Sequence, residues 1–290
     1  MAAEKTPQDY KRAGGYGEGQ IAPAMSADAV AREADMLGEG VSRDAVMALA
    51  GPDPLLEIRG LVAGYGAMEI LHGIDLAIGK AKSLCLVGPN GAGKSTVLHS
   101  IFGFTKITSG EILVNTQVVT KLTPSAKLRD AGIAYILQDN SIFAEMTVEE
   151  NLLMGGYLLD DRYKAREATE RVFGQYERLA KRRREKAGVL SGGERRLLEI
   201  SRALIMDPAV ILVDEPSIGL EPRMIDMVFE ILKDLRDTHH KTIVMVEQNA
   251  KRGLEFADIG YVMVAGRLAL AAPGVELLDN PQVGRLFLGG

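Results

Sequence analysis

The chain contains little cysteine and few aromatic residues. Among its 290 residues there is one cysteine, no tryptophan and an aromatic share of 5%. A single cysteine cannot form an internal disulfide, and this usage is typical of a reducing compartment. Cys85 lies inside an apolar run, so we expect a small buried hydrophobic side chain there rather than a reactive thiol.

Long apolar runs and excess positive charge are also missing. No run approaches the ~20 residues that a membrane-spanning helix needs, and the polar N-terminus lacks the apolar segment of a secretory signal. The net charge of −5 gives no general reason to expect nucleic acid as a partner. We therefore expect a soluble, cytoplasmic protein, with a core formed from its 47% of hydrophobic residues.

Residues 1–54 differ from the rest in composition. Glycines cluster between positions 14 and 19, and prolines occur at 7, 23, 52 and 54. This composition predicts a flexible N-terminal extension, in which 26–37 could form a short helix capped by Ser26. The folded domain is expected to cover 55–290.

The pattern of apolar residues predicts an α/β fold with a mostly parallel sheet. Continuously apolar strands that alternate with helices indicate a parallel sheet covered on both faces. Alternating strands before and after the first buried strand indicate an antiparallel β-subdomain. A helical subdomain follows at about 147–190, opened by a capping box at Thr147 and Glu150. The expected strands are 55–59, 74–78, 83–87, 111–115, 133–137, 210–214, 242–247, 259–264 and 267–271, and the later helices are 194–206 and 223–238.

A glycine-rich loop follows the buried strand 83–87 and precedes a helix, with the spacing G-x-x-x-x-G-K-S. Its glycines allow backbone conformations in which successive N–H groups point at one anion, and the helix start adds its positive dipole end. Lys94 supplies a full charge for the β- and γ-phosphates, and Ser95 supplies a hydroxyl for Mg²⁺. We predict that a nucleoside triphosphate binds at Gly88, Pro89, Asn90, Gly91, Ala92, Gly93, Lys94, Ser95 and Thr96.

A second strand, 210–214, carries two acids at its end. Asp214 emerges at the carboxyl end of this strand, where ligands bind in open α/β sheets, and a carboxylate there suits Mg²⁺. Glu215 follows directly. Beside a metal and a γ-phosphate, one acid can hold the ion while the other takes a proton from the attacking water.

Two glycines occupy the first turn of the helix that follows Ser191. Ser191 and Glu194 form a capping box, but Gly192 and Gly193 each cost about 1 kcal/mol of helix stability. This cost indicates that another group approaches the backbone closely at these two glycines. Exposed N–H groups and a hydroxyl at a helix start form a second anion site.

In these motifs the chain resembles the nucleotide-binding subunits of ABC (ATP-binding cassette) transporters. The order of the motifs also resembles that family. They are a Walker A motif (88–95), a Q-loop at Gln138, a signature motif (190–194), a Walker B motif (210–215) and a D-loop (217–222).

The resemblance implies that two cassettes pair head to tail, so that Ser191, Gly192 and Gly193 of one cover the ATP held by the other. It further implies that Tyr65 stacks on adenine, that Gln138 contacts Mg²⁺ and senses the membrane subunit, and that Glu215 is the general base. The implied partners are a second cassette, two permease subunits and, indirectly, a solute-binding protein. The second cassette would be a different subunit, or else a second copy. The chain would then sit on the inner face of the membrane.

A finer resemblance is to the LivF-type subunit of branched-chain amino-acid importers, based on 146–156, 186–193, 246–250, 257–262 and 288–290. Relatives of that subunit serve urea and short amides, which remain alternatives. A non-transport ABC ATPase is a further alternative, but the interval from Lys94 to Asp214 has no sustained heptads.

The chain departs from the common ABC pattern at two positions. Gln248 occupies the place of the switch histidine; glutamine can donate to a γ-phosphate but cannot become a cation. Glu221 occupies a D-loop position where many ABC proteins carry aspartate. The basic run 181–186 predicts a solvated face, or a contact to a phosphate or an acidic partner, rather than a nucleic-acid site.

Overall fold

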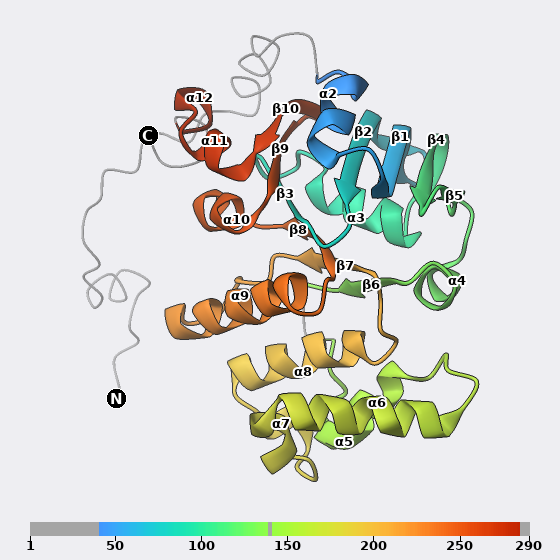
Figure 1. The fold of residues 1–290 in the computed structure, drawn as a ribbon, viewed down its shortest axis with the longest axis vertical. Coiled ribbons are helices and arrows are strands. Elements are labelled where there is room, and N and C mark those ends of the chain that lie inside the picture. Colours follow the sequence, from blue (N-terminus) through green and yellow to red (C-terminus); the bar gives the residue numbers. More distant parts are fainter. Residues whose placement is uncertain (1–40, 139–140, 285–290) are drawn as a thin grey trace, which may run out of the picture.

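The computed structural model describes residues 41–138 and 141–284 (Figure 1). Two sheets and the helices that cover them form one lobe, and a group of helices forms the other (Figure 1). The predicted helix at 26–37 and the predicted flexible segment 1–40 lie outside the described residues. Among those residues, no helix combines the length and apolar character needed to cross a bilayer.

The predicted flexible extension is wrong for its last part, because 43–50 form helix α2 (Arg43–Ala50). Ser42 caps this helix by accepting from the N–H of Ala45. Val46 is 1% exposed and packs into the main core, and Arg43 pairs with Glu57 at 2.5 Å. The apolar face spans only two turns, which is too short to stand out in a sequence pattern.

The antiparallel sheet has the strand order β2-β1-β4-β5. β1 and β2 form a long hairpin, and β4 pairs with the other edge of β1. Tyr65 is the last residue of β1, so the hairpin turn places it at the rim of this sheet. The strands are β1 (Pro54–Tyr65), β2 (Met68–Gly79), β4 (Lys106–Val114) and β5 (Gln117–Val118).

The larger sheet has the order β10-β9-β3-β8-β7-β6 and confirms the predicted parallel core. β8 pairs in parallel with β3 on one side and with β7 on the other, whereas β10 runs antiparallel to β9. The loops that follow β3, β8 and β7 therefore leave the same edge, side by side. The strands are β3 (Ser83–Val87), β6 (Ile133–Ile136), β7 (Val210–Asp214), β8 (Thr242–Val246), β9 (Ile259–Val264) and β10 (Arg267–Pro273).

Helices cover both faces of the parallel sheet. On one face, α3 (Lys94–Phe102) packs its Val97, Leu98 and Ile101 into a core shared with the antiparallel sheet. On the other face, a second core contains residues from α8, α9, α10 and α11. These helices are α8 (Gly192–Leu204), α9 (Pro222–Asp237), α10 (Ala250–Phe256) and α11 (Gly274–Leu278), and α4 (Pro124–Arg129) and α12 (Pro281–Val283) complete this lobe.

The helical lobe has its own core (Figure 1). The capping box predicted at Thr147 and Glu150 is confirmed, with both reciprocal hydrogen bonds present. Leu197 and Leu198 of α8 belong to this third core, whereas Ile200 belongs to the second, so α8 joins the two lobes. The remaining helices of this lobe are α5 (Val148–Gly155), α6 (Arg162–Gln175), α7 (Glu177–Lys181) and the 3-10 turn Ala187–Val189.

A buried lysine in α4 caps the end of α3. Lys127 is fully buried, and its ammonium donates to the carbonyls of Ser100 (3.2 Å) and Ile101 (2.7 Å). Carbonyls at a helix end have no partner inside the helix and attract a cation. Burial nevertheless lowers the pKa of Lys127 from 10.5 to about 8.

Lys127 should make stability depend on pH in the alkaline range. Because its folded pKa of about 8 lies below 10.5, the unfolded chain binds more protons between these values and stability rises with pH across that window. We expect the unfolding free energy of the wild type relative to Lys127→Met to increase by up to about 1.4 kcal/mol per pH unit there. Denaturant titrations at several pH values measure this difference, and a difference that does not change with pH would contradict the assignment.

Candidate active site

The phosphate loop lies between β3 and α3, as predicted. Gly88, Gly91 and Gly93 have φ angles of 148°, 82° and 95°, which favour glycine. At Gly88 a side chain is also excluded by packing, because a Cβ would lie 2.2 Å from the carbonyl oxygen of Met263. The loop therefore has the local geometry that its sequence predicts.

Lys94 is folded over this loop and is 7% exposed. Its ammonium donates to the carbonyls of Gly88 (2.8 Å) and Pro89 (2.9 Å). Burial lowers the pKa of Lys94, and the charges of Glu215 and Asp214 oppose that shift. A lysine ammonium has three donors, so one remains for a ligand above the loop.

Asp214 sits beside the loop and is held on both oxygens. The Ser95 hydroxyl donates to Oδ1 at 3.0 Å, and the Tyr135 hydroxyl donates to Oδ2 at 2.9 Å. Burial, followed by the charge of Asp214, raises the pKa of Tyr135, so the phenol stays a neutral donor. Tyr135 is not among the predicted site residues; its signal in the sequence is a hydroxyl in the otherwise apolar strand β6.

The oxygen atoms around Asp214 fit a hard divalent cation. A serine hydroxyl and a carboxylate already lie 3.0 Å apart, and such oxygen ligands suit Mg²⁺, which keeps several waters and binds substrate phosphates. Ser95, Asp214 and Gln138 are the residues that could hold the ion; Gln138 contacts Glu215, the residue that follows Asp214.

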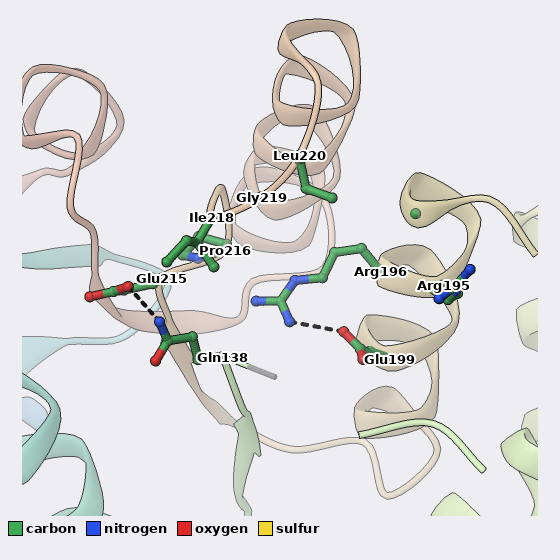
Figure 2. Close-up of a pocket in the computed structure, with 10 residues that line it drawn as sticks. Gln138, Arg195, Arg196, Glu199, Glu215, Pro216, Ile218, Gly219 and Leu220 are labelled. Atoms are coloured by element: carbon green, nitrogen blue, oxygen red, sulfur yellow. Dashed lines mark hydrogen bonds and ion pairs between the residues drawn. The ribbon is translucent and has the colours of Figure 1, made fainter. Parts of the chain in front are cut away.

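Glu215 and Gln138 are in direct contact. The Gln138 amide donates to Glu215 Oε2 at 2.8 Å (Figure 2). Glu215 has a φ of 42°, a left-handed conformation that costs energy for a residue with a side chain. Burial raises its pKa, the carboxylates of Asp214 and Glu247 raise it further, and Lys94 opposes them. A raised pKa makes a carboxylate a better proton acceptor.

A buried arginine links α8 to this site. Arg196 donates to the carbonyl of Leu137 (2.8 Å), directly before Gln138. It also pairs with Glu199 at 2.9 Å (Figure 2). Arg196 and Glu199 line a cleft of about 360 Å³, and the other lining residues include Gln138, Gly192, Glu215, Pro216 and 218–220. Arg196 is not among the predicted site residues, because its partner Leu137 lies 59 positions away.

The signature helix confirms the predicted capping box. Ser191 caps α8 by accepting from Glu194 N, and Glu194 Oε2 accepts from Ser191 N at 2.9 Å. Packing within this chain excludes a side chain at Gly193, because a Cβ would lie 2.1 Å from the sulfur of Met224 in α9. Gly192 has no such neighbour: it is exposed, and the nearest atom to its Cβ position is 3.7 Å away, in Leu220.

The motifs thus separate into two groups. Lys94, Ser95, Asp214, Glu215 and Gln138 share charges or hydrogen bonds at the edge of the parallel sheet. Ser191–Gly193 stands at the start of α8, and Gly192 lines a cleft to which Gln138 and Glu215 contribute but none of the described residues 88–96 does.

Tyr65 and Gln248 lie at the margins of the site. Tyr65 is 41% exposed; its hydroxyl bonds to His99 Nδ1 and its ring meets the imidazole edge to face. Gln248 follows β8 and is exposed. Its neighbour Glu247 is 1% exposed and accepts a hydrogen bond from Ser217 Oγ (2.7 Å), which was not predicted. The roles of Tyr65 and Gln248 stay predictions.

The basic run 181–186 is largely paired within the chain. Arg183 pairs with Glu149 (2.5 Å) and Glu170 (2.6 Å), and Lys186 pairs with Glu145 at 2.9 Å. The glutamates of the helical lobe therefore offset much of the positive charge, in agreement with a solvated face.

Comparison with known proteins identifies the family. The family model described as "ABC transporter" matches residues 71–218. The chain is 38% identical to the probable branched-chain amino acid transport ATP-binding protein LivF of Archaeoglobus fulgidus, over 79% of this chain and 96% of that protein. It is 39% identical to the high-affinity branched-chain amino acid transport ATP-binding protein BraG of Pseudomonas aeruginosa, over 78% and 96%. To LivG of Escherichia coli (strain K12) it is 32% identical, over 81% and 98%.

Solved structures agree with this assignment. A nucleotide-free ATP-binding cassette from an ABC transporter superposes with a TM-score of 0.72 at 27% identity, covering 82% of this chain and 100% of that one. A structure of an ABC-transporter ATP-binding cassette in its ADP conformation gives 0.72 at 28% identity, with coverage of 82% and 100%. The chain therefore belongs to the ABC transporter family, as one of its ATP-hydrolysing cassettes.

Proposed function

We propose that this cassette hydrolyses ATP to energise import of branched-chain amino acids. The observation that carries the substrate class is the identity of 38–39% to LivF and BraG over most of their lengths. The geometry that supports hydrolysis is the group of Lys94, Ser95, Asp214 and Glu215 around the phosphate loop.

Each residue of the group has a task in this proposal. The loop 88–96 cradles the phosphates, and the third donor of Lys94 neutralises them. Ser95, Asp214 and Gln138 would hold Mg²⁺, which when bound offsets charge on the phosphate oxygens. Glu215 takes a proton from a water molecule as its oxygen attacks the γ-phosphorus; the bond to the bridging oxygen breaks and ADP leaves.

The second group of motifs acts on a neighbouring cassette. Ser191, Gly192 and Gly193 would cover the ATP that the partner cassette binds, while Tyr65 stacks on the adenine of the ATP held by this chain. The position of Gly192 supports this division, because Gly192 is exposed and none of the described residues 88–96 lines the cleft that it faces. Gln248 would contact the γ-phosphate from the loop after β8.

We propose that a cytoplasmic segment of a permease subunit docks in a groove beside Gln138, which places the chain on the inner face of the cell membrane. The groove holds about 330 Å³ between β6, α5 and α8, and Tyr135, Phe143, Met154 and Tyr157 line it. Tyr157 is 78% exposed and Phe143 45% exposed. Tyr135 also donates to Asp214, so an occupant of this groove would touch a side chain of the ATP site.

A matched pair of substitutions tests the transport role. Tyr157 and Tyr163 are 78% and 79% exposed, but only Tyr157 lines the groove. In cells lacking the native gene, Tyr157→Glu should abolish uptake of labelled leucine and co-purification of permeases, whereas Tyr163→Glu should restore both. Both proteins should still bind a fluorescent ATP analogue.

The same cells separate the alternative functions. The proposal expects leucine uptake to depend on this chain, and urea uptake to be independent of it. Loss of urea or amide uptake alone would contradict the amino-acid assignment, and an ATPase stimulated by RNA or DNA instead of by permeases would contradict transport.

A further inference from the structure

Glu194 in the first turn of α8 is held by contacts on both of its oxygens. Oε2 accepts from the N–H and from the hydroxyl of Ser191, each at 2.9 Å. Oε1 pairs with Nε of Arg182 at 3.0 Å. Arg182 follows directly after α7, so this contact ties the end of α7 to the start of α8 (Figure 1).

Glu194 carries a negative charge at the start of α8, where the proposed function also brings the negatively charged triphosphate of ATP. Burial raises its pKa, but the Ser191 hydrogen bonds and the charges of Arg182 and Arg178 outweigh this effect and hold the pKa below its usual range. A triphosphate that approaches the start of α8 would therefore meet a like charge beside the helix dipole that attracts it.

Arg182 is the cation placed to cancel this charge. Its guanidinium pairs with Glu194, and also with Glu185 at 3.0 Å. Arg178, the other nearby cation, directs its Nη1 to the sulfur of Met227 instead, at 3.4 Å. The Glu194 and Arg182 side chains are 19% and 38% exposed, so the pair is only partly screened by water.

The hydroxyl of Ser191 has one proton, which it now gives to Glu194. To donate to a phosphate, the hydroxyl must turn away, and Glu194 then loses one of its hydrogen bonds. The Arg182 contact is on the other carboxylate oxygen and does not depend on that proton. It can therefore stabilise Glu194 before and after the hydroxyl turns.

We propose that Arg182 is a positioning residue for the signature motif: it pairs with Glu194 and cancels the charge that would repel the nucleotide from the start of α8. This inference rests on the proposed function, in which Ser191 covers the ATP of the partner cassette. Arg182 itself need not touch the nucleotide.

The test compares Arg182→Met, Glu194→Gln and the double variant in the assembled transporter, purified through a tag on the full-length chain. ATPase rates are measured against ATP concentration. Lys181→Met is the control, because it removes the same charge one position earlier, from an exposed pair with Glu177.

Arg182→Met should raise the half-saturating ATP concentration roughly fivefold, the factor that corresponds to about 1 kcal/mol, the upper end for an exposed pair. Glu194→Gln should not raise the half-saturating concentration, because no anion is left at the start of α8, and Lys181→Met should stay close to the wild type. The double variant should recover, because a neutral amide at 194 still accepts from Ser191 and carries no charge to cancel. Thermal unfolding without nucleotide shows that each variant is folded.

Two outcomes overturn the inference. One is an unchanged ATP dependence in Arg182→Met. The other is a double variant as weak as Arg182→Met, which would mean that Arg182 acts through Glu185 or through α7 alone. If the wild-type transporter shows no ATPase activity, the proposed function itself fails and this inference fails with it. A wild-type transporter that hydrolyses ATP while Arg182→Met is unaffected fails this inference alone.

Discussion

Glu215→Gln should bind ATP normally but lower kcat at least about 100-fold, the lower end of what a positioned general base contributes. The amide is close in shape to the carboxylate and can still accept the hydrogen bond that Gln138 donates at 2.8 Å. It cannot take a proton from water. The variant should therefore separate binding from turnover.

Steady-state ATPase assays, combined with binding of a fluorescent ATP analogue, measure this separation. Because the pKa of Glu215 is raised above 4.5, the wild-type rate should fall on the acid side at a higher pH than for an exposed glutamate. A variant that hydrolyses ATP at the normal rate would show that Glu215 is not the base.

Thermal unfolding provides an internal control for this variant. A raised pKa means that the folded chain holds the Glu215 proton more tightly than the unfolded chain, so stability rises as pH falls through the folded pKa. At neutral pH the ionised carboxylate therefore costs stability. Glu215→Gln removes that cost and should unfold at a temperature no lower than the wild type.

Lys94→Ala should abolish detectable ATP binding and hydrolysis. The substitution removes the buried ammonium that donates to Gly88 and Pro89, and with it the donor left for the phosphates. Loss of a charge-assisted contact in a partly buried site lowers the binding free energy by roughly 1.5–3 kcal/mol from the hydrogen bonds alone. The loop also loses the two contacts from Lys94 that stabilise it. Binding should weaken by more than tenfold at the least.

Equilibrium titration with a fluorescent ATP analogue measures this loss. Lys80→Ala is the matched control, because Lys80 is exposed, just past the end of β2. If Lys94→Ala binds the analogue as tightly as Lys80→Ala does, the phosphate loop is not the nucleotide site. Melting curves for both variants show whether the fold is retained.

Local signals explain why much of the fold could be predicted. The strand, glycine loop and helix at 83–102, the buried strand at 210–214 and both capping boxes depend on residues that are neighbours in the sequence. Each of these elements formed within a few residues of its expected bounds, because local backbone preference and burial favour the same structure there.

The missed residues act through contacts between distant parts of the chain. Tyr135 reaches Asp214 over 79 positions, and Ser217 reaches Glu247 over 30. The reason for glycine at position 193 is likewise a contact with a distant part of the chain. The sequence position of Gly193 suggested an external ligand, yet the side chain of Met224 fills the space where its Cβ would lie. For Gly192 the anion site at the helix start stays a prediction, because this glycine faces the open cleft.

The central claim is that the start of α8 covers an ATP molecule bound by another cassette. Ser191→Arg, assayed in the assembled transporter, tests this claim most directly. The account predicts that turnover falls about as far as in Glu215→Gln, while this chain still binds the fluorescent ATP analogue in its own phosphate loop. Turnover at the wild-type rate with an arginine at position 191 would contradict it.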